Sequence, residues 1–443
     1  MTTPRQRIWG WFFFDWASQP YNTLLLTFIF APYVTELLDD GVAAQTAWGF
    51  GVGAAGLAVA FLAPLLGAIA DASGRRLPWI WVFSVMYVAG AAGLWFAEPG
   101  NLNLLVILAC FAVGLIGMEF ATIFTNAMLP DLGSREEIGR ISGNGWAFGY
   151  LGGLLALVLI LALFAESAET GRTVIGHAPI FGLDPDTRQG TRFVGPFTAA
   201  WYALFMIPFF LFITDAKEAG TTGATAMDGL RALRETLKTL PSRTSLSAFL
   251  LASMLYRDAL NGIYAFGGLY AAGMLGWSVI ETGTFGILAI ASGAFFAWLG
   301  GRADVVFGSK LVVRVCIVAL TLAAVVIVFV SRQSVLGLHV APDSRLPDIA
   351  FYLVGFVIGG AGGSLQAASR TLMVAQAEPY RMTEAFGLYA LAGKATSFIA
   401  PLAIGIVTAM SGSQPLGVVP IIVLFVVGFV LLHWVQPEGD RAA

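Results

Sequence analysis

Apolar stretches long enough to cross a lipid bilayer as helices recur along the whole sequence. They lie near residues 8–37, 46–70, 78–97, 102–128, 142–164, 195–213, 246–273, 279–301, 311–331, 349–374, 385–408 and 416–434. A helix needs roughly 20 apolar residues to span the hydrocarbon core of a membrane. We therefore predict an all-α polytopic membrane protein with twelve transmembrane helices, arranged as two sets of six.

The composition excludes several other classes of protein. Charged residues make up 12% and apolar residues 58% of the 443 positions, whereas soluble domains are about 25% charged. The 24 Lys and Arg residues are outnumbered by 27 Asp and Glu residues, so the chain lacks the basic surface that a nucleic-acid-binding protein needs. Cys110 and Cys316 lie in apolar runs and indicate buried thiols, not a disulfide or a metal site.

The basic residues predict the orientation of the chain in the membrane. If the N-terminus is cytoplasmic, 17 of the 24 Lys and Arg residues lie on the cytoplasmic side, five in the opposite loops and two within spans. Cytoplasmic loops of membrane proteins are enriched in these residues. We expect both termini to be cytoplasmic in a multi-pass protein of the cell membrane, the inner membrane if the source is bacterial.

A polar stretch divides the chain into two similar halves. Residues 214–245 form the only long cytoplasmic segment, and its sequence MDGLRALRETLKTL places apolar residues at helical spacing beside basic ones. This pattern predicts an amphipathic linker helix on the membrane surface. We thus expect an N-terminal six-helix bundle at 1–213, a linker at 214–245 and a C-terminal six-helix bundle at 246–443.

A short motif occurs at equivalent points of the two halves. GAIADASGRR, from Gly67, and GGRADVVFGSK, from Gly300, each place an acid four residues after a glycine, followed by another glycine and a base. Two parallel repeats around a midplane site are the architecture of major facilitator transporters, which the sequence resembles over its whole length. The resemblance implies that Asp71, Arg75 and Asp304 are cytoplasmic latches. A purely topogenic role for the bases is the alternative.

Five ionisable residues fall inside predicted spans, where each charge costs roughly 2.5–3.5 kcal/mol to insert. They are Asp15, Glu119, Arg257, Asp258 and Lys394. At about 1.5 Å per residue, Glu119, Asp258 and Lys394 lie roughly 13–18 Å from the cytoplasmic helix ends. A desolvated carboxylate can take up a proton when its basic partner moves away, so Glu119 and Asp258 are the first candidates for proton coupling. Fixed ion pairs between helices are the alternative.

A closer resemblance rests on five stretches of sequence. These are FFFDWASQPYNTLLLTFIFAPY, NAMLPDLGSREEIGRISGNGWAFGYLGG, YRDALNGIYAFGG, GGSLQAASRTLM and EAFGLYALAGKATSFIAPLAIG. They resemble the bacterial relatives of the vacuolar amino-acid effluxers associated with autophagy. The resemblance implies export of amino acids or similar small solutes, and in the superfamily helices 1, 4, 7 and 10 line the cavity.

Two sets of candidate residues follow, most of them from these resemblances. The residues expected to bind solute or carry protons are Asp15, Asn22, Glu119, Asn126, Asn144, Trp146, Arg257, Asp258, Asn261, Gln366 and Lys394. The residues expected to latch the cytoplasmic side are Asp71, Arg75, Arg140, Asp304 and Arg370. For Trp146, simple packing is the alternative. Glycines in GYLGG and GGAGG are expected to allow close helix packing.

The sequence does not predict an enzyme. His177 and His339 lie in external loops and His433 at the end of the last helix, so no histidine or cysteine cluster reaches the interior, and no phosphate-binding loop is present. We expect no cofactor and no metal. The working hypothesis is a monomeric, proton-linked secondary transporter of a small polar solute. An exporter of hydrophobic or cationic drugs is the main alternative, and a non-transporting receptor is a lesser one; the interior charges favour a polar solute.

Overall fold

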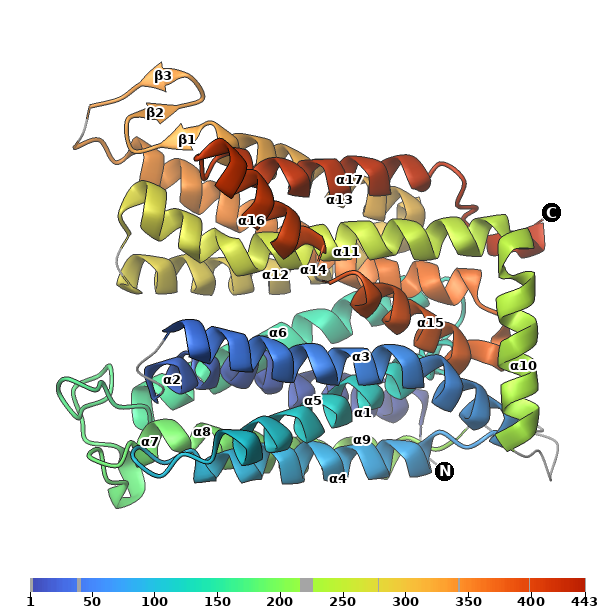
Figure 1. Ribbon diagram of the computed structural model, residues 1–443. Helices are drawn as coiled ribbons and strands as arrows, with labels where there is room; N and C mark the ends of the chain where they lie inside the picture. The colour runs from blue at the N-terminus through green and yellow to red at the C-terminus, as the bar shows by residue number, and fades with distance from the viewer. Residues whose placement is uncertain are drawn as a thin grey trace. The chain divides into compact units, whose positions relative to one another are not determined.

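The computed structural model describes residues 3–37, 41–215, 226–277, 279–341, 343–397 and 399–442. Most of this chain is helical (Figure 1). Eight helices in the described part are long and apolar enough to cross a membrane, and two shorter apolar helices follow at Ile399–Ser411 and Leu416–Leu431. The protein is therefore an all-α, multi-pass membrane protein, as the apolar windows predict.

The chain divides into two compact units. Unit 1 comprises Met1–Leu132 and Phe148–Gly229, and unit 2 comprises Gly133–Ala147 and Leu230–Ala443. The boundary between them falls inside one helix, α6 (Ile138–Leu163), after Ala147. Residues 138–147 of that helix thus belong with the C-terminal half of the sequence.

Unit 1 is a bundle of long helices with a long loop at residues 166–193. Its elements are α1 (Pro4–Pro20), the π-helix η1 (Tyr21–Phe28), α2 (Phe30–Leu37), α3 (Gly41–Ser73), α4 (Leu77–Gly93), η2 (Leu94–Phe96), α5 (Leu104–Asn126), η3 (Leu129–Leu132), the rest of α6, η4 (Ile180–Gly182), α7 (Gln189–Arg192), α8 (Val194–Phe205) and α9 (Ile207–Phe212). Glycine allows α4 and α5 to approach closely: a Cβ at Gly117 would lie 2.6 Å from the carbonyl oxygen of Phe83. The rings of Tyr87 and Tyr202 stack 3.8 Å apart in the core.

The first helix changes its winding at a proline. Pro20 has no N–H to donate to the preceding turn, and the π-helix η1 begins at the next residue. The side chain of Tyr21 then turns inward, where its hydroxyl donates to the carbonyl oxygen of Phe111 at 2.7 Å. In unit 2 the corresponding helix also ends in a π-helix, at Ala271–Leu275.

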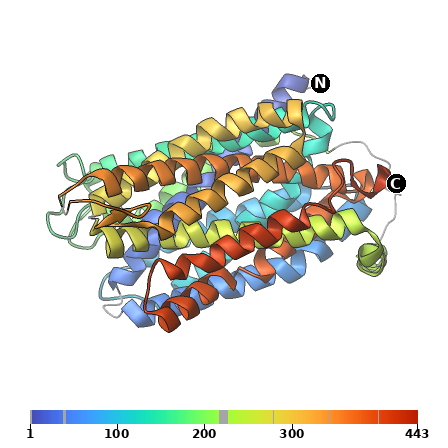
Figure 2. The same ribbon diagram turned by 90° about the horizontal axis from the view of Figure 1, so that it is seen from above.

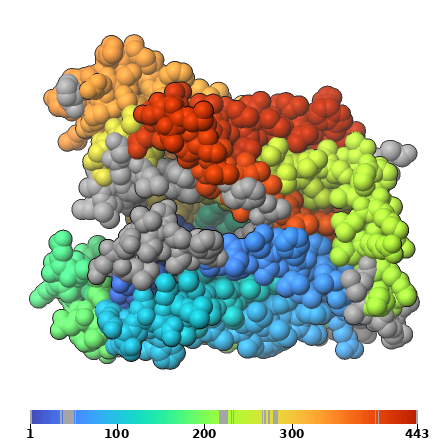
Figure 3. Space-filling view, viewed as in Figure 1, coloured from blue at the N-terminus to red at the C-terminus, as the bar shows by residue number. Residues whose placement is uncertain are grey.

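Unit 2 holds the remaining helices and a small sheet. Its elements are α10 (Ala226–Thr239), which begins at the unit boundary, η5 (Leu240–Ser242), α11 (Thr244–Tyr270), η6 (Ala271–Leu275), α12 (Val279–Phe307), α13 (Ser309–Val328), β1 (Val330–Ser331), β2 (Ser334–Val335), β3 (Leu338–His339), α14 (Leu346–Gln376), η7 (Pro379–Arg381), α15 (Met382–Ala395), α16 (Ile399–Ser411), η8 (Leu416–Val418), α17 (Val419–Leu431) and η9 (Gly439–Ala442). The long helices of this unit run along one another (Figure 2). Val423, Val426 and Val430 of α17 are exposed, as on a lipid-facing helix. The space-filling view shows the C-terminal part of unit 2, in red, at the molecular surface (Figure 3).

Two features of unit 2 differ from a plain row of spanning helices. The window 385–408 is not one helix, because α15 ends at Ala395 and α16 begins at Ile399. In addition, the three short strands form an antiparallel sheet in which Val330 pairs with Val335 and Ser334 with His339. Two-residue strands give too weak a sequence signal to be distinguished from a loop.

The linker contains the predicted amphipathic helix. α10 covers Ala226–Thr239, and its Thr236 accepts a hydrogen bond from Arg381 at 2.7 Å. Arg381 also lies 3.8 Å from the carboxylate of Glu235. These contacts attach α10 to η7, just before α15 begins.

Candidate functional site

The break between α15 and α16 is held by an acid on α11. Asp258 is 1% exposed, and its Oδ2 accepts a hydrogen bond from the backbone N–H of Ala400 at 3.0 Å. This N–H belongs to the first turn of α16, where backbone donors have no partner inside the helix and the helix dipole favours a negative charge. The next residue, Pro401, has no N–H. The N–H of Ala400, which donates to Asp258, is therefore one of the few backbone donors at this helix end.

The second oxygen of Asp258 is buried without a hydrogen-bond partner among the described residues. The hydroxyl of Thr396, in the three-residue break, is likewise buried without a partner in the described part of the chain. Buried polar atoms are nearly always hydrogen-bonded in folded proteins. Two such atoms at one helix break indicate a place that a proton, water or solute can occupy.

Arg257 holds the other side of the same break. Its Nη1 donates to the carbonyl oxygen of Tyr389 in α15 at 2.9 Å, and the guanidinium lies 4.2 Å from the centroid of the Tyr389 ring. The guanidinium also packs on Gly393, where a Cβ would be 2.5 Å from Nη1. Arg257 and Asp258 therefore have different partners, as their angular separation of about 100° on a helix implies.

A third consecutive residue of α11 completes this arrangement. The hydroxyl of Tyr256 is 2.8 Å from the hydroxyl of Ser369 in α14. Tyr256, Arg257 and Asp258 thus contact α14, α15 and α16 in turn. Periodicity alone does not reveal Tyr256 or Ser369 as part of the site, because an aromatic residue in an apolar helix is usually packing.

The other predicted solute-site residues of unit 2 lie on the same or neighbouring helices. Asn261 follows Asp258 on α11 and is exposed, and Gln366 is half-buried on α14. Lys394 belongs to α15 by its backbone, and its side chain lies outside the described part of the structure. Because Lys394 follows Gly393 directly, its backbone is next to the residue that Arg257 contacts.

The first turns of α6 pack tightly into unit 2. A Cβ at Gly143 would lie 2.6 Å from the Cα of Gly301 on α12, so the two helices meet at glycines. A Cβ at Gly139 would lie 2.7 Å from the Cγ of Asp304. The Oδ1 of Asp304 accepts a hydrogen bond from the Ser309 hydroxyl at 2.7 Å. The duplicated acid on α12 therefore faces the start of α6.

Arg370 also binds this part of α6. It is 3% exposed and donates from Nε to the hydroxyl of Ser142 at 2.9 Å and from Nη2 to the carbonyl oxygen of Ser142 at 2.7 Å. Its guanidinium lies 5.6 Å from the ring centroid of Trp146. Asn144, predicted as a solute ligand, accepts from Arg302 at 3.3 Å. Arg140 pairs instead with Glu137, in the turn just before α6, at 3.1 Å.

In unit 1, the motif acid binds the second arginine of the pair and not the first. Arg76 lies 3.3 Å from Asp71 and 3.2 Å from Asp131, whereas the side chain of Arg75 is exposed. Asp215 accepts from the backbone N–H groups of Arg76 and Leu77 at 2.9 and 3.0 Å. In the contacts of the described residues, Asp71 thus pairs with Arg76, the second residue after the turn at Gly74 (φ 64°).

The remaining predicted residues of unit 1 are half-buried in its helices. Asp15 on α1 packs against α6, where a Cβ at Gly149 would be 3.1 Å from its carbonyl oxygen. Glu119 and Asn126 both lie on α5, and Asn22 lies in the π-helix η1. The glycines of GYLGG thus serve the close helix packing that the sequence predicts.

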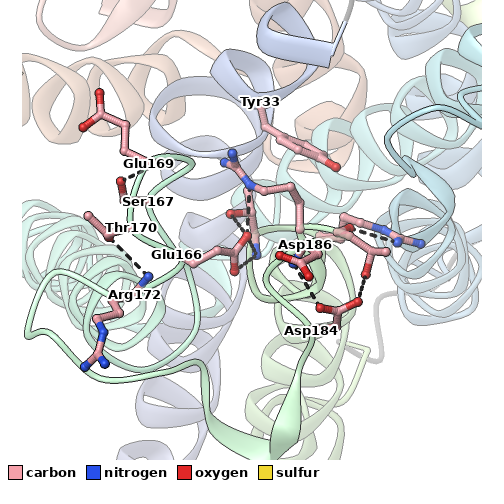
Figure 4. Close-up of polar contacts among 12 residues, drawn as sticks. Tyr33, Glu166, Ser167, Glu169, Thr170, Arg172, Asp184 and Asp186 are labelled. Atoms are coloured by element: carbon pink, nitrogen blue, oxygen red, sulfur yellow. Dashed lines mark hydrogen bonds and ion pairs between the residues drawn. The ribbon is translucent and has the colours of Figure 1, made fainter.

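A polar cluster outside the spans holds the loop of unit 1 at residues 166–193 (Figure 4). Glu166, whose side chain is fully buried, accepts from Arg188 Nε at 3.0 Å and from the hydroxyl of Thr191 at 2.9 Å. The Arg188 guanidinium lies 5.6 Å from the ring of Tyr33 on α2. The loop is thus held through the buried carboxylate of Glu166, and Arg188 also contacts the helix bundle at Tyr33.

Comparison with known proteins identifies the family to which the chain is similar. The family model described as vacuole effluxer Atg22 like matches residues 50–443. The MFS-type transporter YxiO of Bacillus subtilis (strain 168) is 26% identical over 97% of this chain and 94% of its own length. The autophagy-related protein 22-2 of Emericella nidulans is 26% identical over 68% of this chain and 52% of its own length.

The fold has solved counterparts. The structure of the human organic anion transporter MFSD10 superposes with a TM-score of 0.70 at 18% identity, covering 98% of this chain and all of the other. The likeness extends over both units of the chain. The chain therefore belongs to the vacuole effluxer Atg22-like family, and it is a membrane transporter of the major facilitator superfamily and not an enzyme.

Proposed function

We propose that this protein is a proton-coupled secondary active transporter that moves a small polar solute, an amino acid or a similar zwitterion, by alternating access. Its moving parts are two six-helix bundles, residues 1–213 and 246–443, joined by the linker 214–245. We assign twelve spans, both termini to the cytoplasm, a monomeric state and, in a bacterium, the inner membrane.

One observation carries the proposal: Asp258 is buried with one oxygen on the N–H of Ala400 and the other without a described partner. An ionised carboxylate in an apolar interior is costly unless it is paired. The helix dipole and the Ala400 N–H favour the charged form, and burial favours the neutral form. Protonation of Asp258 therefore changes how firmly α11 holds the start of α16, which links a proton to the conformation of the α15–α16 segment.

Arg257 supplies the second half of a site for a zwitterion. Among the described residues its one hydrogen bond runs from Nη1 to Tyr389, which leaves other guanidinium N–H groups for a solute carboxylate. Arginine binds carboxylates through two parallel hydrogen bonds. An ammonium group of the same solute fits the open oxygen of Asp258, and Lys394 provides a further base on α15.

The remaining candidates take supporting roles in this proposal. Asp15, Asn22, Glu119 and Asn126 contribute polar groups from the N-terminal half, and Glu119 is the alternative proton carrier. Asn144, Trp146, Asn261 and Gln366 contribute from α6, α11 and α14. We assign Asp71, Arg75, Arg140, Asp304 and Arg370, together with Arg76, to the latching of the cytoplasmic side; Arg76 pairs with Asp71, and Arg370 donates to Ser142.

The experiment is transport by the purified protein in proteoliposomes. Labelled amino acids, sugars, organic acids and cationic drugs are each tested for counterflow, and then for uptake driven by a pH gradient of either direction. We expect amino-acid exchange that responds to the gradient. Asp258→Asn keeps an oxygen for the Ala400 N–H but cannot exchange a proton, so it should retain counterflow and lose the response to pH.

Glu137→Gln is the matched control, because Glu137 is a carboxylate in the turn before α6 whose described partners are Arg140 and Ser134 and not a residue of α11, α15 or α16. Unchanged gradient-driven transport in both Asp258→Asn and Glu119→Gln would refute proton coupling at these residues. Counterflow confined to hydrophobic cations would replace the zwitterion with a drug substrate. Absence of counterflow for every class would favour a receptor.

A further inference from the structure

An apolar groove in unit 2 lies apart from the site described above. It has a volume of about 490 Å³ and is bounded by α12 and α13, with α14 as its floor. Leu299 and Phe307 contribute from α12, Leu311 and Val315 from α13, and Ala361 from α14. The lining is almost wholly hydrocarbon, so the groove does not suit a charged or zwitterionic solute.

The few polar atoms of the lining are not available to a ligand. The hydroxyl of Ser364 donates to the carbonyl oxygen of Phe296 at 2.6 Å. The other heteroatom in a lining side chain is the thiol of Cys316, a weak donor that behaves as a small apolar group. The occupant is therefore recognised by shape and apolar contact alone over the length of the groove.

The groove opens to the surface that faces lipid. Phe307 is 64% exposed, Val315 59% and Leu299 41%, although all three belong to spanning helices. Large apolar side chains with this exposure, on helices that cross a membrane, contact acyl chains. The bilayer thus supplies an occupant of the right chemistry at very high local concentration.

The length of the groove matches one leaflet. It starts at Phe307 and Leu311, on either side of the turn at Gly308, and reaches Phe296 on α12 and Ala319 on α13. Eleven residues of helix at about 1.5 Å each give roughly 16 Å, about half of a hydrocarbon core of about 30 Å. An acyl chain that enters beside the α12–α13 turn would fill the groove to its end.

A lysine lies at the mouth of the groove. α13 begins at Ser309, whose hydroxyl donates to the carboxylate of Asp304 at 2.7 Å, so the helix end itself already has an acid beside it. Lys310 lies in the same first turn and has no carboxylate partner among the described residues. A lysine near a membrane surface attracts anionic lipid.

We propose that this groove binds one acyl chain of an anionic phospholipid from the leaflet at the α12–α13 turn, with the lipid headgroup beside Lys310. The distribution of Lys and Arg predicts this leaflet to be the cytoplasmic one. The lipid site does not depend on which solute is transported or on proton coupling.

The first test counts bound lipid on the full-length protein by native mass spectrometry. The protein is equilibrated with palmitoyl-oleoyl phosphatidylglycerol and released into detergent. Ala361→Phe fills the floor of the groove and Ala319→Phe fills its far end, so each should lower retention of the lipid at least tenfold. Leu322→Phe is the matched control, because Leu322 is a 60% exposed residue of α13 outside the groove, and it should retain lipid as the parent does.

A second measurement uses the unmodified chain. Cys316 lines the groove and Cys110 does not. Added phosphatidylglycerol should slow labelling of Cys316 by a membrane-permeant maleimide several-fold and leave Cys110 unaffected, whereas inorganic phosphate alone should protect neither. Equal protection by phosphate, equal labelling of Cys316 with and without lipid, or full lipid retention in a folded Ala361→Phe or Ala319→Phe protein would each overturn the proposal.

Discussion

The guanidinium of Arg257 rests on the backbone of Gly393, so closely that a Cβ at this position would lie 2.5 Å from Nη1 and 2.6 Å from Cζ. Glycine is thus the residue that allows α15 to pass Arg257 at this depth. The contact keeps the guanidinium over the ring of Tyr389 and beside the break that Asp258 caps.

We expect Gly393→Ala to impair transport at least tenfold, because the added methyl displaces the guanidinium from Tyr389. A tenfold loss corresponds to about 1.4 kcal/mol in the barrier. Solute counterflow in proteoliposomes measures it. Gly405→Ala in α16 is the matched control, since a Cβ there meets nothing within 4 Å, and it should transport normally. Equal activity of the two variants would show that the Arg257–Gly393 contact is not needed.

Arg370→Lys should weaken the attachment of α14 to α6. Lysine keeps the charge but lacks the planar guanidinium whose separate Nε and Nη2 donate to the hydroxyl and the carbonyl oxygen of Ser142. Hydrogen bonds from charged groups contribute roughly 1.5–3 kcal/mol each, so we expect a lower Tm and slower counterflow. Arg140→Lys tests the same change at an exposed arginine. If both variants unfold at the same temperature as the parent, the contacts of Arg370 do not contribute to the thermal stability of the protein.

Arg76→Ala should lower thermal stability, whereas Arg75→Ala should not. Arg76 is partly buried between Asp71 and Asp131 and its loss leaves two carboxylates without this partner. We expect a loss of roughly 1.5–3 kcal/mol, measured as a shift in Tm of the purified protein. Identical Tm values for the two variants would contradict the assignment of Arg76 as the motif base.

Glu166→Gln should loosen the loop of unit 1 at residues 166–193. The Glu166 side chain is fully buried, and its carboxylate accepts hydrogen bonds from Arg188 and Thr191. The NH2 group of a glutamine amide cannot accept these bonds and would face the N–H and O–H donors of the two residues. An unmet buried donor costs about 1–3 kcal/mol, and faster proteolysis of residues 166–193 should report it. Glu169→Gln, at an exposed position nearby, is the control. Resistance to proteolysis equal to that of the parent would show that the loop is held by other contacts.

Much of the helical framework could be predicted from apolar periodicity. Each apolar window contains a helix, and the amphipathic α10 lies within one residue of the predicted segment. Such features are local: they depend on runs of side chains that the sequence displays directly. The packing glycines of α6 and α14 were predictable for the same reason, because small residues at short intervals mark helix contacts.

The break between α15 and α16 could not be predicted in this way. It coincides with a hydrogen bond from the backbone N–H of Ala400 to Asp258, which is far away in the sequence, and the window 385–408 is mostly apolar although it contains Lys394. The choice of Arg76 over Arg75 likewise depends on the φ of Gly74 and on Asp131. These contacts are tertiary, and a propensity or a spacing contains no information about them.

Three successive residues of α11 are fastened to three different helices: Tyr256 to α14, Arg257 to α15 and Asp258 to α16. Turning α11 about its own axis by even a few degrees would shift all three attachments together. α11 therefore couples α14, α15 and α16 mechanically. A displacement of any one of these helices moves α11 and, through α11, the other two.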